Sequence, residues 1–170
     1  MTPEELDEKT LGYQTAAIVL AANHAGIFRA LCGRPMASTG LARRLKLDRR
    51  AVATVTDALF CLGVLEREGD VLRVPEALRP TLDPASPTTR AHALDHQWYV
   101  LQRWARLDSV LESGEPIPRL REDEERLRAF ILGMADMARR GAGALWDAVD
   151  LSDRAHLVDV GGGPGEFALT

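Results

Sequence analysis

Cysteine, excess positive charge and long hydrophobic runs are all scarce in this sequence. The two cysteines, Cys32 and Cys61, lie in separate apolar segments without Cys-x-x-Cys or Cys/His spacing. We therefore expect buried free thiols in a reducing compartment, and no metal site. A formal net charge of −4 and a pI near 5.6 give no electrostatic support for a general nucleic-acid or anionic-membrane role.

Hydrophobic residues are frequent but are not gathered into a membrane segment. No apolar run reaches the ~20 residues that a membrane-spanning helix needs, and the acidic start does not resemble a secretion signal. These features predict a cytoplasmic protein without a membrane partner. The hydrophobic share, 46% of 170 residues, is high enough for one good core or two small ones.

The chain opens with a strong helix signal. Thr2-Pro3-Glu4-Glu5 has the pattern of a capping box with proline at the first helical position. The helix that follows is expected to break once. Because the segment Ile18–Leu31 is apolar nearly all round, a second copy of the chain is expected to cover it, which predicts a homodimer. An ordinary core helix is the alternative.

The next segment has the order of signals that is typical of a winged helix. Ser38 or Thr39 can cap a short helix, and Asp48 can cap a longer one that Gly63 stops. Two short strands then follow around the turn at 68–70, with Leu65, Leu72 and Val74 available to pack inward.

A helix-turn-helix pattern also raises the possibility of DNA reading. The second helix opens with Arg49 and Arg50, which could meet phosphates. Its exposed face then continues with Ala53, Thr54 and Asp57 and offers no row of Arg, Asn or Gln for base edges. The sequence thus indicates the fold of this motif without a recognition surface, and we expect no nucleic-acid partner. A DNA-binding regulator stays as an alternative.

Two long helices are predicted after a proline-rich loop at 75–87. The first is expected over Thr88–Ser113, and the second runs from the acidic residues at Glu122 to Val149, weakened or bent at Gly141 and Gly143. The apolar stripe of the first helix is formed by Leu94, Trp98, Leu101, Trp104, Leu107 and Leu111.

The C-terminal residues "LVDVGGGPGEFALT" have the pattern of the first strand–turn–helix corner of an α/β domain. Leu157–Val160 predicts a buried strand, and the glycines that follow let a ligand approach the backbone closely. A dinucleotide fingerprint would need glycine where Glu166 stands. The pattern is instead Asp-x-Gly-x-Gly-x-Gly, the variant of this corner that binds S-adenosylmethionine.

With this motif, the whole chain resembles the N-terminal half of S-adenosylmethionine-dependent O-methyltransferases of the plant natural-product and bacterial polyketide-tailoring type. Two more stretches match that family: "WARLDSVLESGEP" and "FILGMADM". The resemblance implies a mainly α fold with a small winged-helix β-hairpin. A helical dimerisation domain is then followed by the first strand and glycine loop of a Rossmann-like methyltransferase domain that is cut short. The implied regions are 1–87 for dimerisation and winged helix, 88–150 for linking and pocket helices, and 151–170 for the start of the cofactor domain.

The resemblance also assigns site residues. Those implied for S-adenosylmethionine are Asp159, Gly161, Gly162, Gly163, Gly165 and Met137, and those implied for the acceptor are His96, Phe130 and Met134. The assignment is physically sensible, because an aromatic face attracts a sulfonium cation and soft thioether side chains adapt to flat acceptors. The alternative is that Phe130, Met134 and Met137 belong to an ordinary core.

His92 and His96 stand four residues apart, which is also the spacing of metal ligands on a helix. No third ligand accompanies them in the sequence, so no metal is predicted. His96 falls where the family's pocket residues lie and is a candidate for contact with the acceptor, although a solvent-facing histidine fits the pattern equally well.

The reaction that the resemblance implies is methyl transfer from a sulfonium to the oxygen of a small aromatic or polyketide acceptor, with a base removing the hydroxyl proton. The catalytic base and the acid that holds the ribose are expected downstream of Thr170, so the chain is expected to be incomplete and inactive alone. Because Leu157–Val160 has no strand to pair with, residues 161–170 are expected to be mobile or paired with another molecule. One half of a two-chain enzyme is a further alternative.

Overall fold

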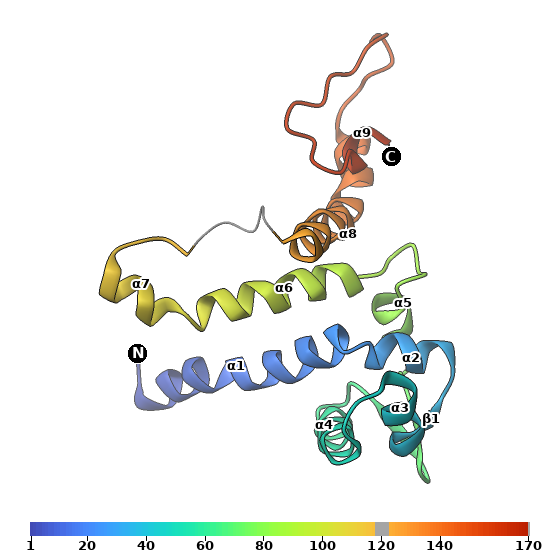
Figure 1. Cartoon of the computed structure of the whole chain (residues 1–170). Coiled ribbons are helices and arrows are strands. Elements are labelled where there is room, and N and C mark those ends of the chain that lie inside the picture. Colours follow the sequence, from blue (N-terminus) through green and yellow to red (C-terminus); the bar gives the residue numbers. More distant parts are fainter. Residues whose placement is uncertain (118–122, 170) are drawn as a thin grey trace. The chain divides into compact units, whose positions relative to one another are not determined.

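The computed structural model describes residues 1–117 and 123–169 (Figure 1). The chain divides into two compact units, Met1–Asp83 and Pro84–Thr170. Each unit is described by itself.

The first unit begins with the predicted broken helix, α1 (Pro3–His24) followed by α2 (Ile27–Gly33). The capping box is formed: the Glu5 amide donates to Thr2 Oγ1 at 3.2 Å, and the Thr2 amide donates to a Glu5 carboxylate oxygen at 2.8 Å. The single break lies where Gly26 takes a φ of 80°, a left-handed conformation that glycine adopts without strain. Both predictions are therefore confirmed.

A helix pair follows, α3 (Ser38–Leu45) and α4 (Arg49–Cys61). Asp48 caps α4 as predicted, accepting a hydrogen bond from the Ala51 amide at 2.8 Å. The cap predicted for α3 is wrong, because Ala37 occupies the N-cap position and no side chain bonds to the helix end there. Ser38 is instead the first residue of the helix.

Three short strands form one antiparallel sheet in the order β1-β3-β2. They are β1 (Met36–Ala37), β2 (Glu66–Glu68) and β3 (Val71–Arg73). The predicted hairpin is β2–β3, paired with Arg67 opposite Leu72. The sheet gains its third strand, β1, from the residues just before α3, with Met36 opposite Leu72.

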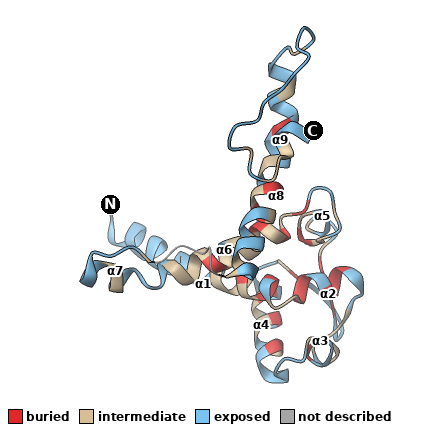
Figure 2. Ribbon diagram, turned by 45° about the horizontal axis from the view of Figure 1, so that its top comes forward, coloured by how far each residue is buried: buried red, intermediate tan, exposed pale blue. Residues whose placement is uncertain are grey.

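The core of the first unit is mainly aliphatic, with the Phe28 ring among it, and its buried positions are red in Figure 2. The largest fully buried side chains here are Phe28, Leu31, Leu41, Leu59, Leu65, Leu72 and Thr56. Each large apolar side chain in such a position stabilises the fold by roughly 1.5–3 kcal/mol through burial. The inward packing predicted for the hairpin is confirmed, because Leu65 and Leu72 are each 1% exposed and Val74 is 7% exposed.

The cysteines behave differently from each other. Cys32 is buried as predicted, and burial raises the pKa of its thiol. Cys61 is exposed, so its predicted burial is wrong. The reason is its place at the last residue of α4, on the far side from the buried Val52 and Leu59.

In the loop predicted at 75–87, a short helix α5 (Arg79–Leu82) forms and Arg79 donates to the Cys32 carbonyl at 3.0 Å.

The second unit shows that the single helix predicted over Thr88–Ser113 is wrong. Two helices form there, α6 (Ala91–Trp104) and α7 (Leu107–Ser113), with the break at Ala105–Arg106. The Ser109 hydroxyl donates to the Arg106 carbonyl at 2.8 Å and closes the first turn of α7. The predicted apolar stripe is also only partly inside, because Trp104 is 66% and Leu111 79% exposed.

The second long helix is α8 (Glu124–Ala148), which is continuous through Gly141 and Gly143. Asp123 caps it, accepting from the Arg126 amide at 3.1 Å, whereas the predicted start at Glu122 lies outside the described residues. α8 packs closely on α6: a Cβ added to Gly133 would lie 3.0 Å from the His96 Cβ and 3.2 Å from the His92 carbonyl oxygen. Glycine at this point lets the two helix backbones approach.

The strand predicted at Leu157–Val160 is not formed, and its predicted burial is wrong: Val158 is 81% and Val160 90% exposed. The physical reason is the one that the sequence already suggested, since no parallel strand among the described residues offers the backbone partners. The expected short helix after the glycines does form, as α9 (Glu166–Leu169).

Within the described residues, no single helix has the length and apolar character to cross a membrane, and the bent pair α1 and α2 passes that test by length and composition alone.

Candidate functional site

The glycine loop and α8 line a solvent-open cavity of about 660 Å³ in the second unit. Its walls come from two segments far apart in the sequence, one face of α8 and the loop before α9. The lining residues are Phe130, Ile131, Met134, Met137, Ala138, Asp159, Gly161, Gly162, Gly163, Pro164 and Phe167. Seven of the nine site residues predicted from the sequence are therefore brought together, and Gly165 and His96 are not among the lining residues.

The backbone of the loop explains its glycines. Gly161, Gly163 and Gly165 have φ angles of 77°, 55° and 79°, a left-handed region that β-carbon-bearing residues rarely adopt. Gly162 is required by close approach instead, because a Cβ there would collide with the carboxylate of Asp159. The turn is closed by the Gly165 amide, which donates to the Gly162 carbonyl at 2.8 Å.

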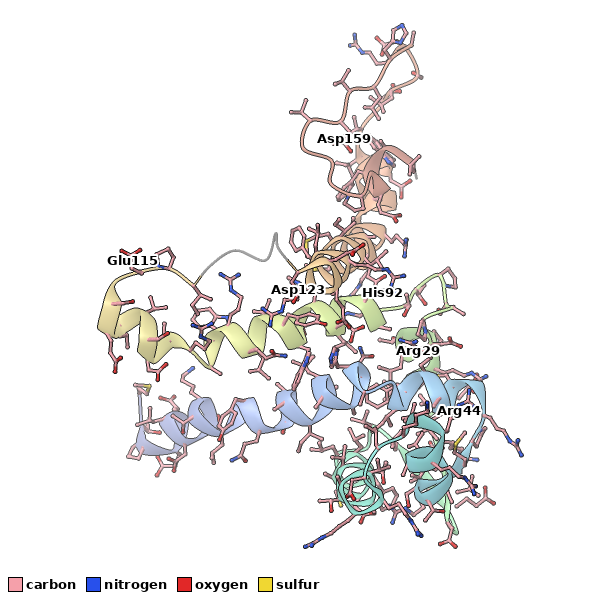
Figure 3. All side chains as sticks on the ribbon, viewed as in Figure 1. Arg29, Arg44, His92, Glu115, Asp123 and Asp159 are labelled. Atoms are coloured by element: carbon pink, nitrogen blue, oxygen red, sulfur yellow. The ribbon has the colours of Figure 1, made fainter. Side chains whose placement is uncertain are left out.

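Asp159 lies directly over this turn, on the segment that leads into α9 (Figure 3). Its carboxylate is the one acidic group among the residues that line the cavity. A negative charge beside an open glycine backbone suits a ligand that carries an amino or sulfonium cation next to polar groups. The residues present therefore fit the aminoacyl end of S-adenosylmethionine.

The opposite wall is apolar and comes from one face of α8. Phe130, Met134 and Met137 are spaced by four and three residues, so they share a helix face. Phe130 is 42% and Met137 55% exposed, so the described residues leave both side chains open to the cavity. An aromatic ring and two thioethers facing a cavity can accommodate a cation and a flat ring.

His96 lies one layer behind this wall. Its ring contacts Phe130 edge-on, with the ring centroids 5.2 Å apart and the planes at 66°. Its Nδ1 is buried without a hydrogen-bond partner among the described residues, and burial lowers the pKa of the imidazole. His96 is therefore neutral at neutral pH and supports Phe130 rather than lining the cavity.

A polar network that the sequence did not reveal connects α6, α8 and α9. Asp136 is 2% exposed and accepts hydrogen bonds from the His92 and Ala93 amides at 3.0 and 3.1 Å, which caps α6 from a neighbouring helix. Arg139 joins Asp136 to Glu166 at the start of α9. The pKa of Arg139 is raised, chiefly by its hydrogen bond to Glu166. A lone acid inside the apolar run 130–138 was the only sequence signal for Asp136.

His92 and His96, whose four-residue spacing would also suit metal ligands, make different contacts. His92 Nδ1 lies 3.3 Å from an Asp136 carboxylate oxygen, and His96 faces Phe130. In residues 1–117 and 123–169, no group of three or more His, Cys, Asp or Glu side chains is placed to hold a metal ion.

Comparisons with known proteins agree with the resemblance found in the motifs. No family model matches the chain. The tetracenomycin polyketide synthesis 8-O-methyltransferase TcmO of Streptomyces glaucescens is 30% identical over 176 residues, which cover 98% of this chain and 52% of TcmO. The N,N-dimethyltransferase OxyT of Streptomyces rimosus is 28% identical over 171 residues, covering 94% of this chain and 50% of OxyT.

Solved structures show the same fold. Human N-acetylserotonin methyltransferase in complex with S-adenosylmethionine superposes with a TM-score of 0.82 at 20% identity, over 98% of this chain and 54% of that enzyme. The chain spans about half the length of the curated relatives it matches. Its sequence and fold are thus similar to the N-terminal half of methyltransferases of the polyketide-tailoring type, and the predicted resemblance is confirmed.

Proposed function

We propose that this chain is the N-terminal part of an S-adenosylmethionine-dependent O-methyltransferase, or of a related tailoring enzyme, that acts on a small aromatic or polyketide natural product. The observation that carries the proposal is the cavity itself. It joins the glycine loop, whose backbone suits the cofactor, to the aromatic and thioether wall of α8, which suits a cation and a flat acceptor. The similarity to TcmO supports the same reading.

The residues of this chain would then have binding and orienting roles. Asp159 and the loop from Gly161 to Gly165 hold the aminoacyl end of the cofactor, which supplies an activated methyl group when bound. Met137 would lie beside the sulfonium, and Phe130 and Met134 would contact the acceptor ring. The base that removes the acceptor proton is proposed to come from the C-terminal half, which the longer relatives contain.

We propose that α3, α4 and the hairpin form a winged helix that serves as a packing module and does not read DNA. Arg49 and Arg50 are exposed, but no row of base-reading side chains follows them on α4. The proposed regions stay at 1–87, 88–150 and 151–170. A gel-shift titration at physiological salt is expected to show no sequence-selective DNA binding.

We further propose a homodimer, on a basis that differs from the sequence argument. Ile27, Phe28 and Leu31 are buried within their own unit, so the segment Ile18–Leu31 no longer requires a second copy. The first half of α1 does expose apolar side chains: Leu6 is 48%, Leu11 56% and Tyr13 59% exposed. Light scattering should give twice 18.6 kDa, and a monomer at all concentrations would remove this proposal.

Calorimetric titration with S-adenosylmethionine tests the function. The chain joined to a C-terminal half, as one polypeptide or as two, is expected to bind the cofactor and to methylate a phenolic acceptor. The isolated chain should bind the cofactor poorly and transfer no methyl group. In the protein that includes the C-terminal half, Gly163→Val should abolish cofactor binding. A β-branched residue cannot hold a φ of 55°, and its side chain would enter the cavity.

Gly143→Val is the matched control, because a Cβ at Gly143 meets no heavy atom within 4 Å and Gly143 does not line the cavity. Loss of binding in both variants would point to a folding defect. Unchanged binding in Gly163→Val would show that the loop is not the cofactor site.

A further inference from the structure

Two polar contacts join the start of α9 to α8, at the consecutive residues Glu166 and Phe167. Arg139 donates to both carboxylate oxygens of Glu166, with Nε–Oε2 at 3.0 Å and Nη2–Oε1 at 2.6 Å. Trp146 Nε1 donates to the Phe167 carbonyl oxygen at 2.8 Å. Because Glu166 and Phe167 directly follow Gly165, these contacts fix both the position and the direction of the end of the glycine loop.

Arg139 also contacts a second carboxylate, that of Asp136. Its Nη1 lies 3.4 Å from an Asp136 carboxylate oxygen, and the Asp136 side chain is 1% exposed. Asp136 cannot move away easily, because it accepts the His92 and Ala93 amides at the start of α6. The N-cap residue of α6, Arg90, makes no side-chain cap bond. Asp136 caps the His92 and Ala93 amides instead, while the Thr89 hydroxyl accepts from the Ala91 amide at 3.1 Å.

An exposed arginine–carboxylate pair is ordinarily a weak interaction. Three features distinguish this one. It is bidentate, its carboxylate partner has a side chain only 18% exposed, and a buried acid fixes the guanidinium. Such a pair loses less side-chain freedom on forming than two free surface chains would.

We propose that Arg139 is a positioning residue for the glycine loop, with Trp146 as a second anchor. α8 supplies Met134 and Met137 to one wall of the cavity. Through Arg139, α8 also fixes the position of the glycine-loop backbone on the opposite side. The loop is then preorganised by a helix and does not depend only on a sheet beneath it. This inference rests on the proposed function for its meaning, but the loop geometry can be measured without any cofactor.

The test is amide hydrogen exchange in the 170-residue chain, followed by NMR. The informative amides are Gly165, which donates to Gly162, and Ala168, which donates to Gly165, because both must open to exchange. In Arg139→Gln these amides should exchange about tenfold faster, as expected when a charged hydrogen-bond pair is lost. Trp146→Phe should act in the same direction.

A double-mutant cycle separates positioning from general destabilisation. If Arg139 acts through Glu166, the variant with both Arg139→Gln and Glu166→Gln should exchange no faster at these amides than either single variant. Arg140→Gln is the matched control, one residue along α8, and should leave the loop unchanged. Additive effects, unchanged exchange in Arg139→Gln, or equally faster exchange along α6 and α8 would each overturn the proposal.

A second arm distinguishes this inference from the proposed function. In protein that includes a C-terminal half, Arg139→Gln should weaken S-adenosylmethionine binding, and Arg139→Lys should lie between the two because lysine keeps the charge without the two-pronged geometry. If the wild type binds no S-adenosylmethionine while the exchange cycle behaves as expected, the function fails and the positioning role stands. If cofactor binds but is insensitive to Arg139, the positioning role fails alone.

Discussion

The two units of this chain bury very different kinds of side chain. The first unit closes around large aliphatic and aromatic groups, and Phe28, Leu41 and Leu59 are each 0% exposed. The second unit buries mainly small residues and one carboxylate, as at Ala93, Ala135 and Asp136. Several of its large apolar side chains lie outward, with Trp104 at 66% and Leu111 at 79% exposed, although Tyr99 is buried at 8%.

This difference separates stability from function along the chain. The hydrophobic term that drives folding is concentrated before Asp83, whereas every residue that lines the cavity lies after it. The second unit therefore depends on helix caps, a close helix–helix approach and polar contacts. Variants in the two units should differ in the size of their effects and in the signals that report them.

The largest effect is expected from Phe28→Ala in the first unit. Removing a fully buried ring should lower the free energy of unfolding by about 3–5 kcal/mol, because a cavity replaces its contacts. Circular dichroism during urea unfolding measures the loss. The fluorescence of Trp98, Trp104 and Trp146 reports the second unit alone, since all three tryptophans lie there. Trp104→Ala, at an exposed site, should cost far less.

The second-largest loss in the free energy of unfolding is expected from Asp136→Ala. The His92 and Ala93 amides would lose their acceptor, and Arg139 would lose its rear support, for a loss of about 2–3 kcal/mol seen by tryptophan fluorescence. Asp147→Ala on the exposed face of α8 is the control. Equal unfolding curves for the two variants would show that Asp136 does not cap α6.

A smaller effect with a change of sign is expected from two glycines of α8. Gly133→Ala should destabilise the second unit by about 1–3 kcal/mol, because its Cβ would press on His96 and on the His92 carbonyl. Gly143→Ala should stabilise it by about 0.5–1 kcal/mol, since alanine favours helix and its Cβ would meet open space. Stabilisation by both changes would mean that α6 and α8 are not closely packed.

The smallest effect is expected from the pH dependence of His96. Burial lowers its pKa in the folded chain below the unfolded value of about 6.5, so the unfolded chain takes up the proton first as the pH falls. Above about pH 6.5, His96 does not change the free energy of unfolding. Below that pH, its burial makes the free energy of unfolding fall. In His96→Gln, the decline in unfolding free energy between about pH 7.5 and 5.5 should be smaller than in the wild type.

Local signals in the sequence were enough to predict much of the first unit. The capping box at Thr2, the Asp48 cap and the β2–β3 hairpin each depend on residues a few positions apart, so the pattern contains the whole cause. The break at Ala105–Arg106 could not be predicted in this way, because neither proline nor glycine marks it. Likewise, periodicity placed Trp104 on an apolar stripe but could not say whether anything would cover it.

The site was predicted in part for a similar reason. The glycine pattern identifies its own loop, since Gly161, Gly163 and Gly165 all need positive φ. The long-range contacts of the network around Asp136 and Arg139 join residues 27 to 44 positions apart, and no spacing rule connects such pairs. The predicted strand at Leu157–Val160 failed because a strand is defined by its neighbours, and its neighbours are not in the described residues.

The small sheet of the first unit has a consequence for association between copies of the chain. Its two edges are β1, only two residues long, and β2, which reads Glu-Arg-Glu with every residue exposed. A short or highly charged edge is a poor template for adding a foreign strand, because charged side chains resist desolvation and few backbone groups are offered. The edges of this sheet therefore give little support to amyloid-like, strand-to-strand growth between copies of the chain.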